Sequence, residues 1–281
     1  MPFTNNVQTQ SAMAGGTRIH YYDSDPTRKG RGTIVLLHGT AGSAENNFWA
    51  LYPMLALRHR VVALDFVDPD AQVPAAQPYL EQVLAVVEAA SGDTPVHLVG
   101  YSFGAVIAAL FAARHGQRVE SLTLVAGWVK TDNQQRLRNA VWRSLHDSGH
   151  EALAEFSIFA NYSQNFLNAR NDTELQALVN SARSGPNRSK KMAFNLTVDI
   201  GQELARITAP TLVVGCTLDI TTPLRHARML FGGIADSRFA EINSGHGVVH
   251  ERPAELFTMI DEFVSDPIAQ PAGHVVENAH A

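Results

Sequence analysis

Short apolar runs alternate with longer amphipathic or alanine-rich stretches along most of the chain. Unbroken apolar runs of about five residues are typical of strands buried on both faces of a parallel sheet. We expect such strands at 33–37, 61–66, 122–126, 211–215 and 238–242, and one more that begins at Val96. We expect helices at 46–58, 78–90, 105–111, 223–230 and 253–264. This alternation predicts an α/β fold, with helices on both faces of a mostly parallel sheet.

The two ends of the chain differ from this pattern. Residues 17–22 alternate in polarity and predict an early edge strand. Residues 1–16 and 266–281 are polar or rich in Pro, Ala and His, and we expect flexible tails there. The first of these tails lacks a basic stretch followed by an apolar core, so we expect no signal peptide.

The strand pattern is interrupted over residues 128–201, which are polar and helical in pattern. Residues 17–127 and 202–265 are therefore expected to form the core, with 128–201 inserted as a helical cap above the strand ends, where ligands bind in such sheets. We expect the aromatic residues Phe156, Phe159 and Phe166 to pack the cap onto the core and not to form an aromatic substrate-binding site. A small basic excess in the cap fits an anionic substrate, but a solvated helical face explains it equally well.

Composition narrows the function classes. The chain has 281 residues, one cysteine and a formal net charge of -5. A mixed, slightly acidic charge argues against a nucleic-acid partner, and no apolar run approaches the length of a membrane span. A single cysteine excludes an internal disulfide and fits a reducing compartment, so we expect a cytoplasmic protein.

The stretch Gly100-Tyr101-Ser102-Phe103-Gly104 lies between the strand that begins at Val96 and an alanine-rich helix. A G-x-S-x-G sequence between a strand and a helix is a nucleophile elbow, in which a sharp turn exposes the serine hydroxyl. The flanking glycines allow the strand and the helix to approach closely. The helix N-terminus behind the serine offers free N–H groups to a developing oxyanion.

The chain resembles the α/β-hydrolase family over roughly residues 17–264. Three motifs match in the family's order: His38-Gly39-Thr40 after an early strand, the elbow at Ser102, and a late Asp and His. The resemblance implies a mostly parallel sheet with a helical cap after the sixth strand, which is where the insertion falls. It also implies a hydrolase with a serine nucleophile, a histidine base and a carboxylate.

The resemblance assigns candidate catalytic residues. Ser102 needs an adjacent base to act as a nucleophile, and His246 follows the last core strand between two glycines. Asp219 follows the strand 211–215 and would fix the tautomer of that histidine. Asp132 is the alternative acid, because some family members carry the acid after the sixth strand.

The remaining site predictions concern the oxyanion and the pocket. Backbone N–H groups of Phe103 and Thr40, or of Ala41 in place of Thr40, are expected to form the oxyanion hole. Tyr101 and Trp128 are the candidate substrate-binding residues. We expect no metal and no cofactor, since the histidines at 246 and 250 lack the glutamate that a zinc-protease helix would have.

The sequence therefore predicts a serine hydrolase that cleaves a carboxylic ester or lactone through an acyl-enzyme on Ser102. Alternatives are a thioesterase of natural-product biosynthesis, whose elbows the pentapeptide around Ser102 resembles, a C–C bond hydrolase, and a non-catalytic ligand-binding protein of the same fold. The expected partner is a small-molecule ester, lactone or thioester. An aspartate nucleophile is absent from the elbow, which disfavours haloalkane dehalogenase and epoxide hydrolase activities.

Overall fold

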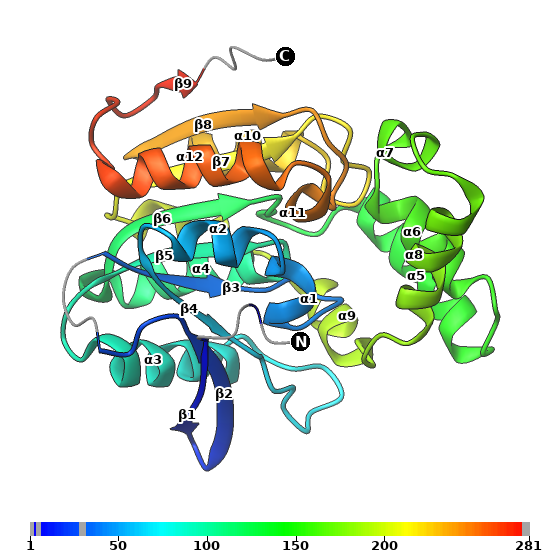
Figure 1. The fold of residues 1–281 in the computed structure, drawn as a ribbon, viewed down its shortest axis with the longest axis horizontal. Helices are drawn as coiled ribbons and strands as arrows, with labels where there is room; N and C mark the ends of the chain where they lie inside the picture. The colour runs from blue at the N-terminus through cyan, green and yellow to red at the C-terminus, as the bar shows by residue number, and fades with distance from the viewer. Residues whose placement is uncertain (1–2, 4–6, 28–31, 277–281) are drawn as a thin grey trace.

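The core of the molecule is a nine-stranded sheet flanked by helices (Figure 1). The structure is a computed structural model that describes residues 3, 7–27 and 32–276. The strands lie in the order β1-β2-β4-β3-β5-β6-β7-β8-β9. Their bounds are β1 Gln8–Ala14, β2 Thr17–Asp23, β3 Thr33–Leu37, β4 Arg60–Leu64, β5 Val96–Tyr101, β6 Val119–Val125, β7 Thr211–Cys216, β8 Ser237–Ile242 and β9 Val275–Val276. Strands β3 to β9 pair in parallel, and β1 and β2 form an antiparallel hairpin beside β4. The predicted α/β fold with a mostly parallel sheet is confirmed.

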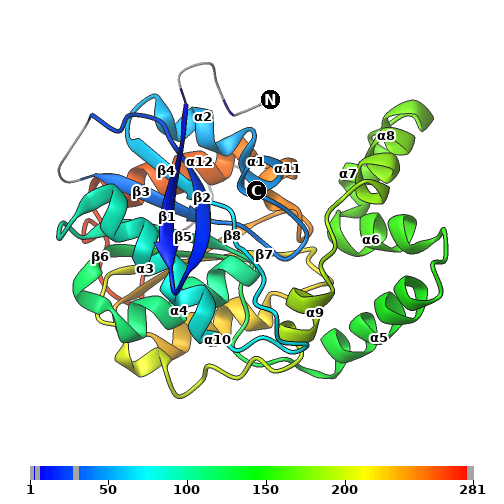
Figure 2. The same cartoon turned by 90° about the horizontal axis from the view of Figure 1, so that it is seen from below.

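Helices cover both faces of the sheet (Figure 2). One face carries α3 Gln77–Ser91, α4 Phe103–Arg114 and α10 Arg225–Gly233, and the other carries α1 Ala44–Phe48, α2 Leu51–Ala56, α11 Val248–Glu251 and α12 Pro253–Ser265. Successive strand residues alternate between two hydrophobic cores: Val35 and Leu37 of β3 join the first, and Ile34 and Leu36 join the second. Burial on both faces explains why the central strands are continuously apolar.

The structure of the two chain ends differs from the predictions. Residues 1–16 are not a flexible tail throughout, because Gln8–Ala14 forms β1 and pairs along its whole length with β2. Consequently β2 is not the edge strand, since β1 takes that position. Only Ala12 of β1 is buried, so the hydrophobic pattern could not reveal this strand. In the expected C-terminal tail, Val275–Val276 forms β9 beside β8.

The helix expected over residues 46–58 is two short helices, α1 and α2, separated at Trp49 and Ala50. The physical reason is Pro53 in the first turn of α2. Proline has no N–H to donate to the carbonyl four residues earlier, and its ring collides with that carbonyl in a continuous helix. A helix can therefore start just before Pro53 but cannot run through it from α1.

Five helices lie between β6 and β7, where the sequence predicts a helical insertion. They are α5 Asn133–Asp147, α6 Leu153–Asn161, α7 Gln164–Asn168, α8 Asp172–Arg183 and α9 Ser189–Asn195. We call them the α5–α9 segment. The segment lies beyond the carboxyl ends of the parallel strands (Figures 1 and 2). In sheets of this type ligands bind at those ends.

Candidate active site

Ser102 lies in the sharp turn between β5 and α4. Its backbone has φ 55° and ψ -119°, a left-handed φ that costs free energy for any residue other than glycine. The flanking positions must be glycine because the backbones of β3, β5 and α4 approach each other closely there. A Cβ on Gly100 would collide with the backbone of Gly104, and a Cβ on Gly104 would collide with the carbonyl of Leu37 on β3. The strained turn is thus held by tight packing between the sheet and α4.

The structure brings His246 and Asp219 to Ser102. His246 Nε2 lies 2.8 Å from Ser102 Oγ, and His246 Nδ1 lies 2.7 Å from Asp219 Oδ2. All three residues are buried. An ionised carboxylate can only accept, so Nδ1 carries the proton and Nε2 is free to accept the proton of the Ser102 hydroxyl. This arrangement can raise the nucleophilicity of the serine oxygen.

The Asp219 carboxylate is fixed by the loop that follows β7. Its Oδ1 accepts hydrogen bonds from the backbone N–H groups of Thr221 at 2.7 Å and Thr222 at 2.8 Å. Its Oδ2 accepts from the Thr222 hydroxyl at 2.8 Å as well as from His246. These donors occupy the carboxylate on both oxygens and hold it facing the imidazole.

The alternative acid, Asp132, is engaged elsewhere. It is the N-cap of α5 and accepts a hydrogen bond from the backbone N–H of Gln135 at 2.9 Å. Its Oδ2 also forms an ion pair with Arg225 and accepts a hydrogen bond from His226 Nε2 at 2.7 Å. The structure therefore places Asp219, and not Asp132, against His246.

Glu251 holds the loop that carries His246, and sequence reasoning missed it. Its carboxylate accepts hydrogen bonds from Gly245 N at 3.1 Å, from Ser163 N at 2.8 Å and from Ser163 Oγ at 2.6 Å. On the other side of the histidine, Gly247 N donates to the carbonyl of Asn161 at 2.7 Å. The α5–α9 segment thereby clamps the His246 loop from two sides.

The two predicted oxyanion residues lie beside Ser102. Phe103 is the first residue of α4, a position whose N–H has no partner one turn back in the helix. Thr40 lies in the loop after β3 and lines the same cavity as Ser102, as does Ala41. The Thr40 hydroxyl accepts a hydrogen bond from Asn195 Nδ2 at the end of α9, at 2.9 Å.

His38 braces the loop that carries Thr40. Its Nε2 accepts from the backbone N–H of Phe66 at 3.1 Å, and its Nδ1 donates to the carbonyl of Gly39 at 2.8 Å. Burial, together with the nearby Lys191 ammonium, lowers the pKa of His38 to about 4. The ring is therefore neutral at pH 7, which the hydrogen bond from Phe66 requires. His38 therefore ties the Thr40 loop to the loop after β4.

Tyr101 and Trp128, the predicted substrate-binding residues, both line this cavity. The Tyr101 hydroxyl donates to the backbone carbonyl of His246 at 2.9 Å, and burial raises the pKa of Tyr101 well above its ordinary value. Trp128 is buried, and its Nε1 donates to Thr131 Oγ1 at 3.0 Å. The Phe103 side chain points elsewhere and packs edge to face against Phe66, Tyr79 and Phe194 in the core.

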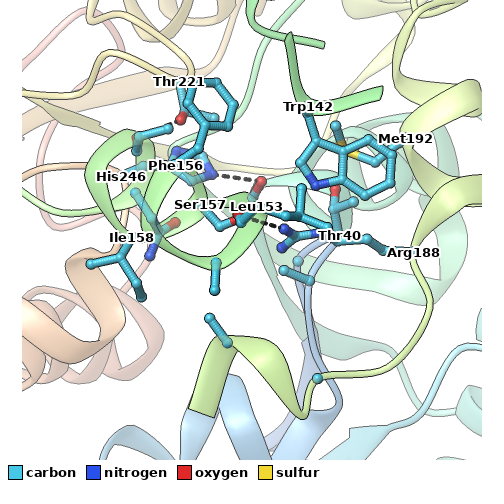
Figure 3. Close-up of a pocket in the computed structure, with 18 of the residues that line it drawn as sticks. Thr40, Trp142, Leu153, Phe156, Ser157, Ile158, Arg188, Met192, Thr221 and His246 are labelled. Carbon is cyan, nitrogen blue, oxygen red and sulfur yellow. Dashed lines mark hydrogen bonds between the residues drawn. The ribbon is translucent and has the colours of Figure 1, made fainter. Parts of the chain in front are cut away.

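A cavity of about 1200 Å³ lies between the sheet edge and the α5–α9 segment. Ser102 and His246 line its base, together with other residues of the core loops. Residues of the segment, among them Trp142, Phe156 and Arg188, line the opposite side (Figure 3). The expectation that Phe156, Phe159 and Phe166 pack the cap onto the core is wrong. Phe156 and Phe166 line the cavity, and Phe159 is 63% exposed. Helical periodicity alone does not distinguish a face that meets the core from one that meets an open cavity.

The comparisons with known proteins agree with this geometry. A family model described as the alpha/beta hydrolase fold matches residues 32–253. The chain therefore belongs to the α/β-hydrolase family.

Individual relatives are similar at low identity. A pyrrolizixenacetamide deacetylase of Xenorhabdus hominickii is 27% identical, covering 84% of this chain and 91% of the relative. A pimeloyl-acyl-carrier-protein methyl ester esterase of Neisseria meningitidis is 25% identical, covering 86% and 80%. Among solved structures, an α/β-hydrolase enzyme from a Medee basin deep-sea metagenome library has a TM-score of 0.81 at 20% identity, covering 91% of this chain and 97% of that one. The names of the two sequence relatives support a hydrolase of this fold.

Proposed function

We propose that the protein is a serine hydrolase that cleaves a carboxylic ester or lactone through an acyl-enzyme on Ser102. The observation that carries this proposal is the chain of short hydrogen bonds from Ser102 through His246 to Asp219, at the base of a large cavity. Family membership supports it, because the strand–turn–helix elbow is where this family carries its nucleophile.

In the proposed reaction, Ser102 Oγ attacks the substrate carbonyl carbon while His246 Nε2 takes the hydroxyl proton. Asp219 stabilises the imidazolium that forms. Backbone N–H groups of Phe103 and Thr40 stabilise the negative oxygen of the tetrahedral intermediate. His246 then gives its proton to the departing alcohol oxygen, and the acyl group stays on Ser102.

A water molecule completes the cycle. His246 removes a proton from the water as it attacks the acyl carbon, and returns that proton to Ser102 Oγ as the acid leaves. Tyr101 and Trp128 are proposed to contact the substrate from the cavity wall. The α5–α9 segment is proposed to act as the cap that encloses the substrate.

The names of the relatives set the range of bonds to examine. One relative is named a deacetylase and another a methyl ester esterase, so acetamides, acetyl esters and methyl esters are natural first substrates. Amide hydrolysis is the second candidate activity, and the deacetylase relative favours it. The same serine attack serves both bonds, with an amine in place of the alcohol as the leaving group.

The test is a substrate panel assayed with purified protein and with Ser102→Ala. The panel contains acetyl and methyl esters, lactones, acyl thioesters and acetamides. We expect turnover of at least one oxygen ester or lactone, and loss of that turnover by roughly 10³-fold or more in Ser102→Ala, since the nucleophile is removed. Turnover that survives in Ser102→Ala would overturn the mechanism. Fast turnover confined to thioesters would replace ester hydrolysis by thioester hydrolysis.

A further inference from the structure

Two arginines that face the cavity have no carboxylate ion-pair partner within residues 7–27 and 32–276. Arg138 lies on α5 and Arg188 directly precedes α9, and both line the cavity. Among the described residues, no carboxylate forms an ion pair with either guanidinium. Arg138 Nε is buried and has no hydrogen-bond partner in the part of the chain that the structure describes. Arg188 donates to a neutral group, the Ser157 hydroxyl at 2.5 Å, and its guanidinium lies 5.3 Å from the centre of the Trp142 ring (Figure 3).

The other arginines of the cavity wall are engaged within the protein. Arg183 forms an ion pair with Glu155 at 2.5 Å. Arg170 hydrogen-bonds to the carbonyl of Phe166 and lies 3.1 Å above the centre of that ring. Arg170, like Arg188, has no carboxylate partner among the described residues, but its guanidinium is held against the carbonyl and the ring of Phe166. Of the arginines in this wall, Arg138 has a buried Nε without a partner in the described part of the chain.

Burial makes these two cations costly in the free protein. Removing a guanidinium from water without a counter-ion is unfavourable, and so is placing two like charges near each other. Burial lowers the pKa of Arg188 to about 10, and the charge of Arg138 contributes to the lowering. Burial also lowers the pKa of Arg138, and the charge of Asp219 partly opposes that lowering. A guanidinium stays protonated in a protein at pH 7, so the two arginines bring two positive charges to the cavity wall.

A third donor belongs to the same wall. Trp142 Nε1 is buried and has no hydrogen-bond partner among the described residues. Glu151 also lines the cavity, and no ion pair joins it to Arg138 or Arg188 within the described part of the chain. Asp219 is occupied by His246 and its own loop. Among the described residues, the buried donors of Arg138 and Trp142 in this wall therefore lack acceptors.

We propose that Arg138 and Arg188 bind a carboxylate carried by the substrate, so that the preferred substrates are esters with a second, ionised carboxyl group. The inference rests on the proposed function for the bond that is cleaved. Arg188 and His246 point into the same cavity (Figure 3), so one substrate molecule can place its ester at Ser102 and its carboxylate at the arginines. Guanidinium groups suit this role because their planar fork matches a carboxylate.

The experiment compares two matched substrate series. One is the monomethyl esters of glutaric, adipic, pimelic and suberic acids, and the other is the same esters with the free carboxylate replaced by a neutral carboxamide. We expect kcat/KM to favour the carboxylate by about tenfold to a hundredfold at one chain length, as for a hydrogen bond to a charged group. The ratio should fall toward one in Arg138→Met and in Arg188→Met, and persist in the control Arg183→Met. Because it is a ratio within each variant, general damage to the enzyme cancels.

A conservative variant shows whether a loss of preference comes from misfolding or from the guanidinium itself. Arg188→Lys keeps the charge but loses the fork, so it should keep only part of the preference. A second readout uses no catalysis: calorimetric binding of adipate to Ser102→Ala, which should weaken with added salt and disappear when Arg188→Met is combined with it.

The outcomes separate this inference from the proposed function. If neutral esters are hydrolysed but the carboxylate series has no advantage, the carboxylate site is wrong and the hydrolase proposal stands. If no ester is hydrolysed at all, the hydrolase proposal fails, and adipate binding decides the site. Binding that requires both arginines supports the site, and absence of binding overturns it.

Discussion

The base and the roof of the cavity are built on opposite principles. At the base, Asp219 accepts hydrogen bonds on both carboxylate oxygens, and His246 is bonded through both ring nitrogens. In the roof, formed by the α5–α9 segment, Arg138 and Trp142 each have a buried donor that finds no partner in the described structure. The base comes from loops that follow the strands of the sheet, and the roof comes from helices that cover them.

The difference separates two tasks. A fully bonded constellation is rigid and presents the same nucleophile to any substrate that reaches it. A buried donor without a partner costs free energy until a ligand accepts its hydrogen bond. Such donors therefore favour ligands that carry an acceptor at that place. Changes at the base should therefore lower the rate for every substrate. Changes in the roof should alter the ranking of substrates.

The largest effect is expected at the base. Asp219→Asn should lower kcat by roughly 10⁴ on all substrates, because the amide favours the wrong tautomer of His246. Asp132→Asn is the matched control, since its carboxylate caps α5 and pairs with Arg225 and His226 away from the nucleophile. Steady-state kinetics of both variants, with circular dichroism to verify folding, make the measurement. A larger loss in Asp132→Asn than in Asp219→Asn would contradict the assignment.

The second effect concerns the free energy of unfolding and the loop after β3, which His38 braces. His38 must be neutral to accept its hydrogen bond, and its pKa is about 4 in the folded protein against 6.5 for the free side chain. Between these values the unfolded state binds the proton and the folded state does not. Stability contributed by neutral His38 is therefore complete above about pH 6.5 and is lost as the pH falls toward 4, by at most about 3 kcal/mol.

Urea unfolding at several pH values between 7 and 4 measures this contribution. The His38→Gln variant, whose amide can offer both an acceptor and a donor, should show a shallower fall of unfolding free energy with decreasing pH. His20→Gln, an exposed histidine on β2, is the control and should follow the wild type. Equal slopes for His38→Gln and wild type would contradict the account.

A smaller effect is expected where the two regions meet. Glu251 is a positioning residue that ties the His246 loop to Ser163 in the α5–α9 segment. Glu251→Gln loses one acceptor oxygen and should lower kcat by about tenfold, the effect of one buried hydrogen bond, with KM nearly unchanged. Glu262→Gln, exposed on α12, is the control. A loss confined to thermal stability, with kcat intact, would show that Glu251 does not position the histidine.

The smallest effect belongs to the roof. Trp142→Phe keeps an aromatic ring beneath Arg188 but removes the unpaired N–H. We expect the preference for carboxylate over carboxamide esters to fall by about threefold, less than for either arginine, because a neutral donor contributes less than a charged one. Phe156→Leu serves as the control within the same wall. A uniform loss of rate on both series would place Trp142 in the general machinery of the base.

The base could be predicted from sequence because its residues sit at defined positions in the fold. Ser102 ends a strand between two glycines, and Asp219 and His246 follow later strands that must end at the same edge. A parallel sheet converts these positions along the chain into proximity. The resemblance to the α/β-hydrolase family supplied the expected order of serine, acid and histidine, and the family match confirmed the fold.

The roof could not be predicted in the same way. Arg138 and Arg188 are far apart in the chain, on helices whose packing no strand register dictates. The sequence showed only a basic excess in this segment, which a solvated surface explains equally well. Strand β1 could not be predicted for a related reason. Only Ala12 of its residues is buried, so its sequence has no hydrophobic pattern, and the strand forms because it pairs with β2.

The most direct test of the central claim is to trap the acyl-enzyme. The protein is mixed with p-nitrophenyl acetate, quenched with acid within milliseconds, digested and examined by tandem mass spectrometry. We predict a burst of p-nitrophenol and one acetylated peptide, with the acetyl group on Ser102, and neither in Ser102→Ala. Release of p-nitrophenol with the acetyl group on another residue, or an equal burst from Ser102→Ala, would contradict the claim.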